Sequence, residues 1–335
     1  MCQKKNNSLN AKDLIIDLVS PLIAREKYIP AYQGKFTCVG VTLAVNDNKE
    51  ETLKTINAWK QRFDQIQHNL HHVKSVQDIN YTYQHDKLGI LFHFQNTAPI
   101  NDDLSMIEAY YSLGVRVIQL TYNGQNSFGY GCEVEDKGLT PKGREWVSEM
   151  NRVGMLIDLS HAGYKTAEDV ILASRQPVIL SHSNAKTLCH SDRNVPDEII
   201  QGIAKSGGVI GLNAFSAFVK EKVAQATLDQ FIDHAQYIAE LVGVQHLSLG
   251  LDYYTGQWPY VTTEEAIRNY HRNLEKGIWK PRNYPRPPHK WVTSLETPDK
   301  IHNLKPALLF RGFSQEAVEM ILATNLLRVF SQVWK

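Results

Sequence analysis

The chain has 335 residues, of which 36 are Lys or Arg and 35 are Asp or Glu. This charge balance gives no basis for a nucleic-acid partner or an anionic membrane surface, and no apolar run approaches the length of a membrane span. The four cysteines show no C-x-x-C spacing, and the N-terminus lacks the apolar segment of a signal peptide. We therefore expect a cytoplasmic protein with reduced thiols.

Eight strand-like runs alternate along the chain with segments of helical periodicity. The runs are apolar throughout, which is typical of strands covered on both faces of a parallel sheet. This alternation predicts an α/β fold of the (β/α)8 TIM-barrel type, and no glycine-rich phosphate loop follows the first run to favour an open doubly wound sheet. The predicted strands are 13–19, 36–43, 87–94, 115–122, 154–161, 177–183, 207–214 and 246–253, and the predicted helices are 50–72, 102–113, 140–152, 164–174, 196–206, 227–242 and 314–327.

Residues 255–302 interrupt the alternation. This segment holds three tryptophans and the proline-rich stretch N-Y-P-R-P-P-H at 283–289, and it is too long for an ordinary loop between a strand and a helix. Because it follows the last strand, we expect it to fold over the carboxyl-terminal mouth of one barrel domain that spans 1–335. Two interpretations stay open: a structural excursion or dimer contact, and a lid that shapes the pocket. A homodimer is expected, since homodimers are the commonest assemblies.

Two histidines, His161 and His182, end the runs G-M-L-I-D-L-S-H and P-V-I-L-S-H-S. The carboxyl ends of parallel strands face the ligand crevice, so two imidazoles from neighbouring strands would form half of a metal site. Asp252 ends the eighth run and is expected to face the same mouth. We interpret it as the carboxylate that moves a proton during hydrolysis; the alternatives are a helix cap and a buried ion pair.

Polar side chains near other strand ends complete the candidate site. Tyr122 and Asn123 end the fourth run, and Asn213 ends the seventh. Arg193 lies in the loop after the sixth run and can hold a carboxylate through two parallel hydrogen bonds. We expect Arg193, Asn123 and Asn213 to bind the substrate; the alternative for Arg193 is a salt bridge to a neighbouring aspartate.

Several longer motifs resemble those of the membrane dipeptidase (renal dipeptidase) family of zinc hydrolases. This resemblance implies a metal-dependent barrel of the amidohydrolase kind, usually with two zinc ions, that cleaves dipeptides. It also implies that His161 and His182 bind one zinc, that Arg193 binds the substrate and that Asp252 is the acid/base. The motifs are L-I-D-L-S-H-A (156–162), V-I-L-S-H-S-N-A (178–185), D-R-N-V-P-D (192–197), L-S-L-G-L-D-Y (247–253) and the stretch 303–330.

The chain departs from this family pattern at three strand ends. The first strand, I-I-D-L-V-S-P-L (15–22), lacks the His-x-Asp pair that holds the other zinc, and Gln95 stands in place of the glutamate that bridges both ions. Tyr122 replaces a histidine that contacts the substrate, and it can still donate a hydrogen bond to an oxyanion. We therefore expect a single zinc on the two histidines, completed by water, Asp252 or Gln95.

These features favour a metal-dependent, dipeptidase-like hydrolase that acts on a small carboxylate-bearing amide, either a dipeptide or an acylated amino acid. A second interpretation is a barrel that binds a small molecule without hydrolysing it, which the missing ligands of the first metal suggest. A third is a different reaction on the same scaffold, such as that of a lyase or a deaminase, because a fold does not fix a function.

Overall fold

The strands of this protein are short and are connected by longer helices. The computed structural model describes residues 14–65 and 69–335. The strands are β1 (Ile16–Asp17), β2 (Cys38–Ala44), β3 (Leu70–Val73), β4 (Leu88–Phe94), β5 (Val115–Gln119), β6 (Leu156–Asp158), β7 (Val178–Ile179), β8 (Ile210–Leu212) and β9 (Leu247–Leu249). The helices are α1 (Lys49–Phe63), α2 (Val76–Gln84), α3 (Ser105–Ser112), α4 (Pro141–Val153), α5 (Tyr164–Ala173), α6 (Asp197–Lys205), α7 (Ser216–Val219), α8 (Leu228–Val242), α9 (Thr263–Glu275), α10 (Leu304–Phe310), α11 (Gln315–Glu319) and α12 (Asn325–Val333).

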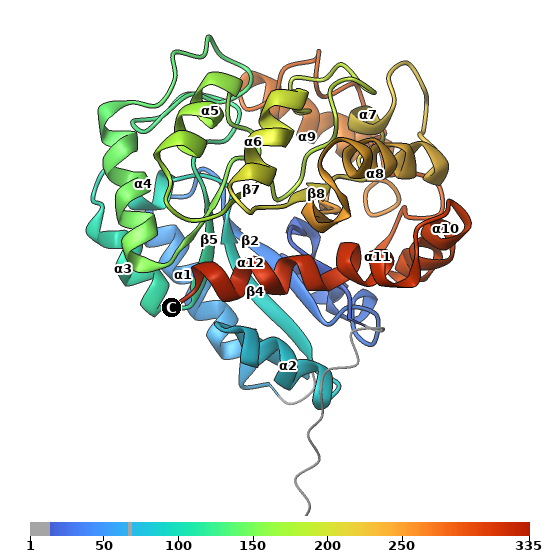
Figure 1. Ribbon diagram of the computed structural model, residues 1–335, viewed down its shortest axis with the longest axis horizontal. Coiled ribbons are helices and arrows are strands. Elements are labelled where there is room, and N and C mark those ends of the chain that lie inside the picture. The colour runs from blue at the N-terminus through green and yellow to red at the C-terminus, as the bar shows by residue number, and fades with distance from the viewer. Residues whose placement is uncertain (1–13, 66–68) are drawn as a thin grey trace, which may run out of the picture.

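Eight parallel strands close into a ring. The pairing order is β1-β2-β4-β5-β6-β7, and β8 pairs with β9. The two sheets join through a parallel bridge between Leu180 and Ile210, and Leu18 N donates to Leu249 O at 3.0 Å on the other side. Figure 1 shows the strands inside a layer of helices. The predicted α/β barrel is therefore confirmed, and each of the eight predicted strands overlaps a strand of the ring.

The predicted helix 50–72 is wrong in its second half. Helix α1 ends at Phe63, and residues 70–73 form β3, an additional strand that pairs with β4 outside the ring. The ring of His72 stacks on that of Phe63 with centroids 5.0 Å apart. Strand pairing and this aromatic contact, which helical periodicity does not report, decide the conformation of these residues.

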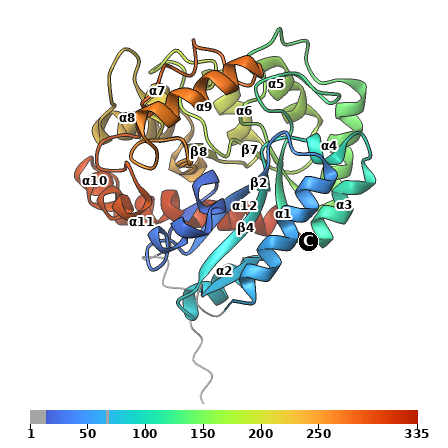
Figure 2. The same cartoon turned by 180° about the vertical axis from the view of Figure 1, so that it is seen from behind.

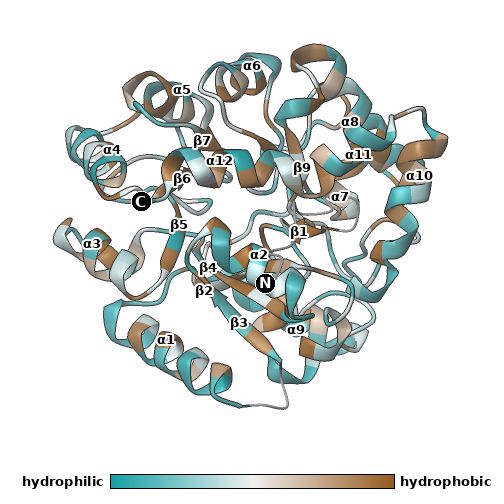
Figure 3. Ribbon diagram, turned by 60° about the horizontal axis from the view of Figure 1, so that its bottom comes forward, coloured by the Kyte–Doolittle hydropathy of each residue, from teal (hydrophilic) through white to brown (hydrophobic). Residues whose placement is uncertain are grey.

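Helices seal the amino-terminal end of the barrel. Ile16, Val117 and Leu156 from the strands are buried in one cluster with Val329 and Phe330 of α12. Figure 3 shows α2 and α12 over the strands, with α1, α3, α4, α5, α6 and α8 around them. Figure 2 shows α9 at the end opposite α2. The carboxyl-terminal end of the strands is therefore the end that is open to a functional site. None of the helices in the two described ranges is long and apolar enough to cross a membrane.

Asp17 is a fully buried carboxyl group inside the ring. Its Oδ1 accepts hydrogen bonds from Leu251 N (2.8 Å) and Val19 N (3.3 Å), whereas Oδ2 has no partner. Burial raises the pKa of Asp17 to about 7, although the two backbone bonds oppose the rise. The folded protein therefore favours the protonated form, which lets Oδ2 exist without a full negative charge.

We expect Asp17 to make the protein less stable as the pH rises from about 4 to about 7. The folded state holds this proton up to a higher pH than the unfolded chain does, so its contribution is greatest below the unfolded pKa and falls by up to about 1.4 kcal/mol per pH unit in this window. The measurement is the free energy of unfolding in urea for the wild type and Asp17→Asn between pH 4 and 8. The variant should gain on the wild type as the pH rises; parallel curves would contradict the assignment.

Candidate functional site

Two turns with left-handed backbone conformation aim His161 and Asp252 at the barrel mouth. Strands β6 and β9 each end three residues before them, and the φ angles are 68° at His161 and 60° at Asp252. This conformation costs about 1–3 kcal/mol for a residue other than glycine and is concentrated at functional sites. The two predicted strands that extend to 161 and 253 are therefore too long at this end.

Glycine lets the strands approach closely beneath the site. A Cβ atom at Gly250 would lie 1.7 Å from Ser181 O, and one at Gly211 would lie 1.9 Å from the same oxygen. A side chain at either position would push away the backbone that carries His182.

A pocket of about 170 Å³ lies between the strand ends and the 255–302 segment. This volume is below the range of about 300–1,000 Å³ that is usual for drug-sized ligands, so the pocket fits a small molecule. A larger hollow, of about 810 Å³ between α5 and α6, contains none of the predicted site residues. The small pocket is lined by Pro21, Val45, Gln95, Tyr122, His161, Phe215, Phe218, Asp252, Tyr254, Trp279, Tyr284, His289 and Trp291.

The rings of His161 and His182 meet edge to edge, with their Nε2 atoms 2.9 Å apart and their planes tilted by 59°. Nδ1 of His161 lies 2.6 Å from Oδ1 of Asn123. The amide of Asn123 has a fixed orientation because its Nδ2 donates to the carbonyl of Ile278 at 2.9 Å. Oδ1 therefore accepts the proton of His161 Nδ1, which leaves a lone pair on Nε2 of that ring.

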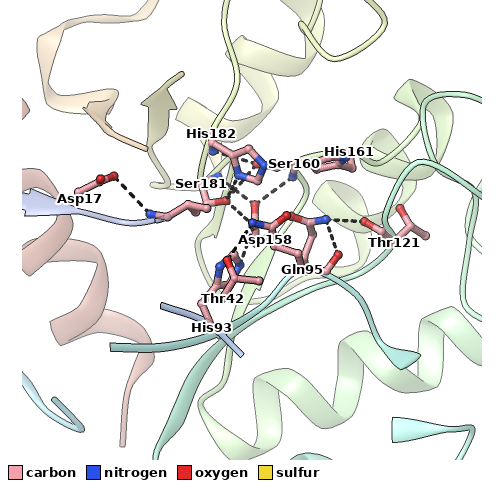
Figure 4. A network of polar contacts seen from close by, with 12 residues as sticks. Asp17, Thr42, His93, Gln95, Thr121, Asp158, Ser160, His161, Ser181 and His182 are labelled. Carbon is pink, nitrogen blue, oxygen red and sulfur yellow. Dashed lines mark hydrogen bonds and ion pairs between the residues drawn. The ribbon is translucent and has the colours of Figure 1, made fainter. Parts of the chain in front are cut away.

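The partners of His182 fix the same tautomer. Ser181 Oγ donates to Oδ2 of Asp158 at 2.5 Å, so it accepts from His182 Nδ1 at 2.7 Å. Although burial alone would raise the pKa of Asp158, the hydrogen bond from His93 and the one from Ser181 hold that pKa well below its usual range. Figure 4 shows this cluster around the imidazole pair.

Both imidazoles are neutral at pH 7. Burial, followed by the charge of Arg193, lowers the pKa of His161 and of His182 well below the ordinary value. Two neutral rings with protonated Nδ1 atoms direct two Nε2 lone pairs at one point. Neutral imidazole held through its other nitrogen is the form that binds metal ions.

Asp252 lines the pocket and is fixed by Asn213. Nδ2 of Asn213 lies 3.3 Å from Oδ2 of Asp252, and Oδ1 of Asn213 accepts from Phe215 N at 2.8 Å. Burial raises the pKa of Asp252 to about 7, against the opposing effects of Arg193 and Asn213. Asn213, which the sequence predicts to bind substrate, is buried behind the pocket lining and contacts Asp252.

Asn123, which the sequence also predicts to bind substrate, contacts one of the two imidazoles and the 255–302 segment. Its Oδ1 accepts from His161, and its Nδ2 donates to Ile278 O at 2.9 Å and to Tyr284 Oη at 3.2 Å. Both protons of the amide are therefore engaged, and the side chain is buried. Asn123 ties the 255–302 segment to one of the two imidazoles.

Arg193 is a buried cation without a carboxylate partner in the described ranges. Its Nη2 donates to His182 O at 3.2 Å, and its Nε has no partner. The adjacent Asp192 pairs instead with Arg282, at 2.6 Å. Cζ lies 5.5 Å from the ring centroid of Phe218, which lines the pocket. A buried guanidinium in this state favours an anionic group of a ligand as its counterion.

Gln95 and Tyr122 both line the pocket. Nε2 of Gln95 donates to Thr42 Oγ1 at 2.9 Å, which leaves its Oε1 as the free polar atom. The ring of Tyr122 stacks on that of His161 at 4.1 Å, and its hydroxyl accepts from Trp279 Nε1 at 3.4 Å. Burial raises the pKa of Tyr122 to about 12, so the phenol keeps its proton and remains a donor.

The protein groups at the imidazole pair are too few for the usual zinc centre. Across residues 14–65 and 69–335, no group of three or more His, Cys, Asp or Glu side chains is arranged to hold a metal ion. A catalytic zinc usually has three protein ligands and a water. The residues present therefore do not fit a two-metal centre, and they supply only two imidazoles for a single ion.

Some polar partners of the two rings were not predicted from the sequence. They are Ser181 Oγ and two groups of the 255–302 segment, Ile278 O and Tyr284 Oη. The Ser-His dipeptide that follows both strands was the available signal for Ser181, and the aromatic, proline-rich composition of 255–302 was the signal for the other two groups.

The chain is similar in sequence to known dipeptidases. Residues 27–276 match the sequence model described as membrane dipeptidase (peptidase family M19). An uncharacterized dipeptidase of Schizosaccharomyces pombe is 32% identical over 210 residues, which cover 61% of this chain and 50% of that protein. This chain thus spans about half to three fifths of the length of the curated relatives it matches.

Solved structures share the barrel. An amidohydrolase from Pseudomonas aeruginosa superposes with a TM-score of 0.84 at 30% identity, covering 97% of both chains. A dipeptidase described as a metallo peptidase of family M19 superposes with a TM-score of 0.78 at 18% identity, covering 96% of this chain and 99% of that one.

We expect Asn123→Asp to loosen the 255–302 segment while it retains an acceptor for His161. The carboxylate cannot donate to Ile278 O, and each lost buried hydrogen bond costs about 1–3 kcal/mol. Hydrogen–deuterium exchange of residues 278–284 should become several-fold faster. Asn126→Asp is the matched control, because Asn126 bonds to Thr97 and Leu120 instead. Equal exchange in both variants would contradict this assignment.

Proposed function

Because this chain belongs to the membrane dipeptidase family, we propose that it is a hydrolase that cleaves the amide bond of a small, carboxylate-bearing, dipeptide-like substrate. One observation carries the proposal: a carboxyl group with a pKa of about 7, Asp252, lines the same small pocket as His161. The cation of Arg193 acts on this carboxyl group and has no carboxylate partner among the described residues. The chemistry of amide hydrolysis requires these functions together: an acid/base group and a group that holds the substrate.

Each side chain has a distinct role in this proposal. Arg193 holds the substrate carboxylate, since a fixed, buried positive charge gains a counterion only when the ligand binds. Tyr122 donates a hydrogen bond to the carbonyl oxygen as negative charge develops on it. Asp252 takes a proton from the attacking water and returns it to the leaving amine, and a pKa near 7 suits both transfers.

A single zinc ion on His161 and His182 remains our prediction for the cofactor. The two Nε2 lone pairs converge at 2.9 Å, which favours one shared cation at this point. When bound there, a zinc ion would supply Lewis acidity to a water or to the substrate carbonyl. Two protein ligands instead of the usual three imply weak binding.

We expect purified protein to hold at most one zinc ion per chain and to lose it in His161→Ala. Plasma emission spectroscopy on protein purified without chelator measures the content. Gln95→Glu should raise metal affinity, because a charged carboxylate is a better ligand than an amide. Two ions per chain in the wild type would contradict the reading of Gln95 and of the first strand.

We expect Asp252→Asn to lower kcat for a hydrolysed substrate by about 100-fold or more, with little change in KM. The isosteric amide keeps the shape of the site but cannot accept the proton. Asp233→Asn is the matched control: Asp233 pairs with Arg311 on the surface, at 2.6 Å, and its loss should leave kcat unchanged. A panel of dipeptides and acylated amino acids, offered with added zinc, manganese or cobalt, is the assay. No turnover anywhere in the panel would overturn the proposal.

A second candidate is a barrel that binds a small molecule without turnover. The incomplete metal-ligand set favours it. Tight binding of a panel compound that persists in His161→Ala and His182→Ala, without hydrolysis, would support this function over the first.

The cellular context stays a proposal as well. We propose a cytoplasmic protein, since the cysteines in the described part of the chain, Cys38, Cys132 and Cys189, are free thiols. The homodimer remains a prediction from the sequence.

A further inference from the structure

The 255–302 segment carries a concentration of positive charge, although the chain as a whole is nearly neutral. Residues 268–290 contain seven Lys or Arg and one acidic residue, Glu275, whereas the complete chain has a net charge of +1. Four of the seven cations are exposed and make no ion pair or side-chain hydrogen bond with any residue of the ranges 14–65 and 69–335. They are Arg268, Arg272, Lys276 and Arg286. These four charges are therefore free to act on a ligand.

Two acidic residues around the segment already have other partners. Asp192 pairs with Arg282 at 2.6 Å, and Glu296 pairs with Lys300 at 2.8 Å. Neither carboxylate is available to the four free cations, so their charge is not cancelled by these neighbours.

Three of the free cations form a stripe along helix α9. Arg268, Arg272 and Lys276 are four residues apart, so they lie on one face of the helix, while Ala266 and Tyr270 are buried on the opposite face. The carboxyl end of a helix offsets only about half of an elementary charge. The stripe therefore presents most of its positive charge to solvent.

Helix α9 lies directly behind one wall of the pocket. The ring centroid of Tyr270 lies 6.5 Å from that of Trp279 and 6.1 Å from that of His289, and both of these rings line the pocket. Figure 2 shows α9 at the end of the molecule opposite α2, which is the end that holds the barrel mouth. A helix with its side chains is about 10–12 Å across, and the Debye length is about 10 Å at 0.1 M salt. The field of the stripe therefore reaches the mouth at moderate ionic strength.

We infer that this stripe attracts substrates with a second negative charge, in addition to the carboxylate that the proposed function assigns to Arg193. The inference rests on that function, because it names the substrate class of the same site. The pocket, of about 170 Å³, is small, so a second anionic group, such as a side-chain carboxylate, stays at the mouth within the field of the stripe. A field of this kind raises the rate of association and weakens steeply as salt is added.

Two isosteric pairs of compounds test the inference. Glycyl-glutamate and glycyl-glutamine have the same shape and differ by one negative charge, and N-acetyl-glutamate and N-acetyl-glutamine form a second pair of this kind. The measurement is the ratio of kcat/KM, anionic over neutral compound, at pH 7.5. We expect this ratio to fall at least about threefold between 10 mM and 1 M ionic strength, because the Debye length shrinks from about 30 Å to about 3 Å. Effects of salt on the enzyme itself cancel in the ratio.

Removal of the stripe assigns this effect to α9. In the triple variant Arg268→Gln, Arg272→Gln and Lys276→Gln, the salt dependence of the ratio should fall to less than half, and glutamine preserves the helix because it is a good helix former. The matched control removes three exposed cations from the opposite end of the barrel, where α1, α5 and α6 end, and should keep the salt dependence of the wild type. These substitutions are Lys60→Gln, Arg175→Gln and Lys205→Gln.

The outcomes separate the inference from the proposed function. Hydrolysis with a ratio that does not change with salt, or that changes equally in the two triple variants, would overturn the inference and leave the hydrolase standing. If nothing is hydrolysed, the same ratio is measured on dissociation constants by calorimetry. A salt-dependent preference for the anionic compounds that the stripe variant loses would then support the inference while the hydrolase fails, and binding of none of the four compounds would overturn both.

Discussion

The site depends on two nitrogen lone pairs that point at each other. His161 and His182 both carry their proton on Nδ1, because Asn123 Oδ1 and Ser181 Oγ accept it. Their Nε2 atoms then meet at 2.9 Å, an arrangement that is repulsive unless a cation is shared between them. Such a pair persists only where the surrounding structure holds both rings. Asp158 and Ser181 hold the ring of His182 through its Nδ1 atom. The 255–302 segment holds the ring of His161 through Asn123.

The strained turns and the closed ring of strands both place the polar groups at one end of the barrel. Left-handed turns at His161 and Asp252 carry a backbone cost, and the tightly packed barrel compensates for it elsewhere. Helix α12 and α2 bury the amino-terminal ends of the strands in an apolar cluster, which leaves polar groups concentrated at the other end. The stability of the protein and its chemistry therefore occupy opposite ends of one ring.

The periodicity of the sequence was sufficient to predict the ring of strands, but it did not predict the contacts of the site residues. The eight strands and the nearness of His161 to His182 follow from the rule that parallel strands end at one edge. The contacts of Asn123 and Asn213 do not follow, because both residues lie beyond the strand ends, where the alternation of side chains no longer applies. Strand β3 was missed for a related reason: its pairing with β4 is a long-range contact that the polar sequence around 64–72 does not encode as a period.

Charge distinguishes this site from the family pattern it resembles. Where that pattern has a carboxylate, this chain has Gln95, and Arg193 lacks a carboxylate partner within the described ranges. A buried cation without a carboxylate partner favours an anion as its neighbour. The raised pKa of Asp252 follows the same logic, since its carboxyl group lies buried where few partners stabilise a negative charge.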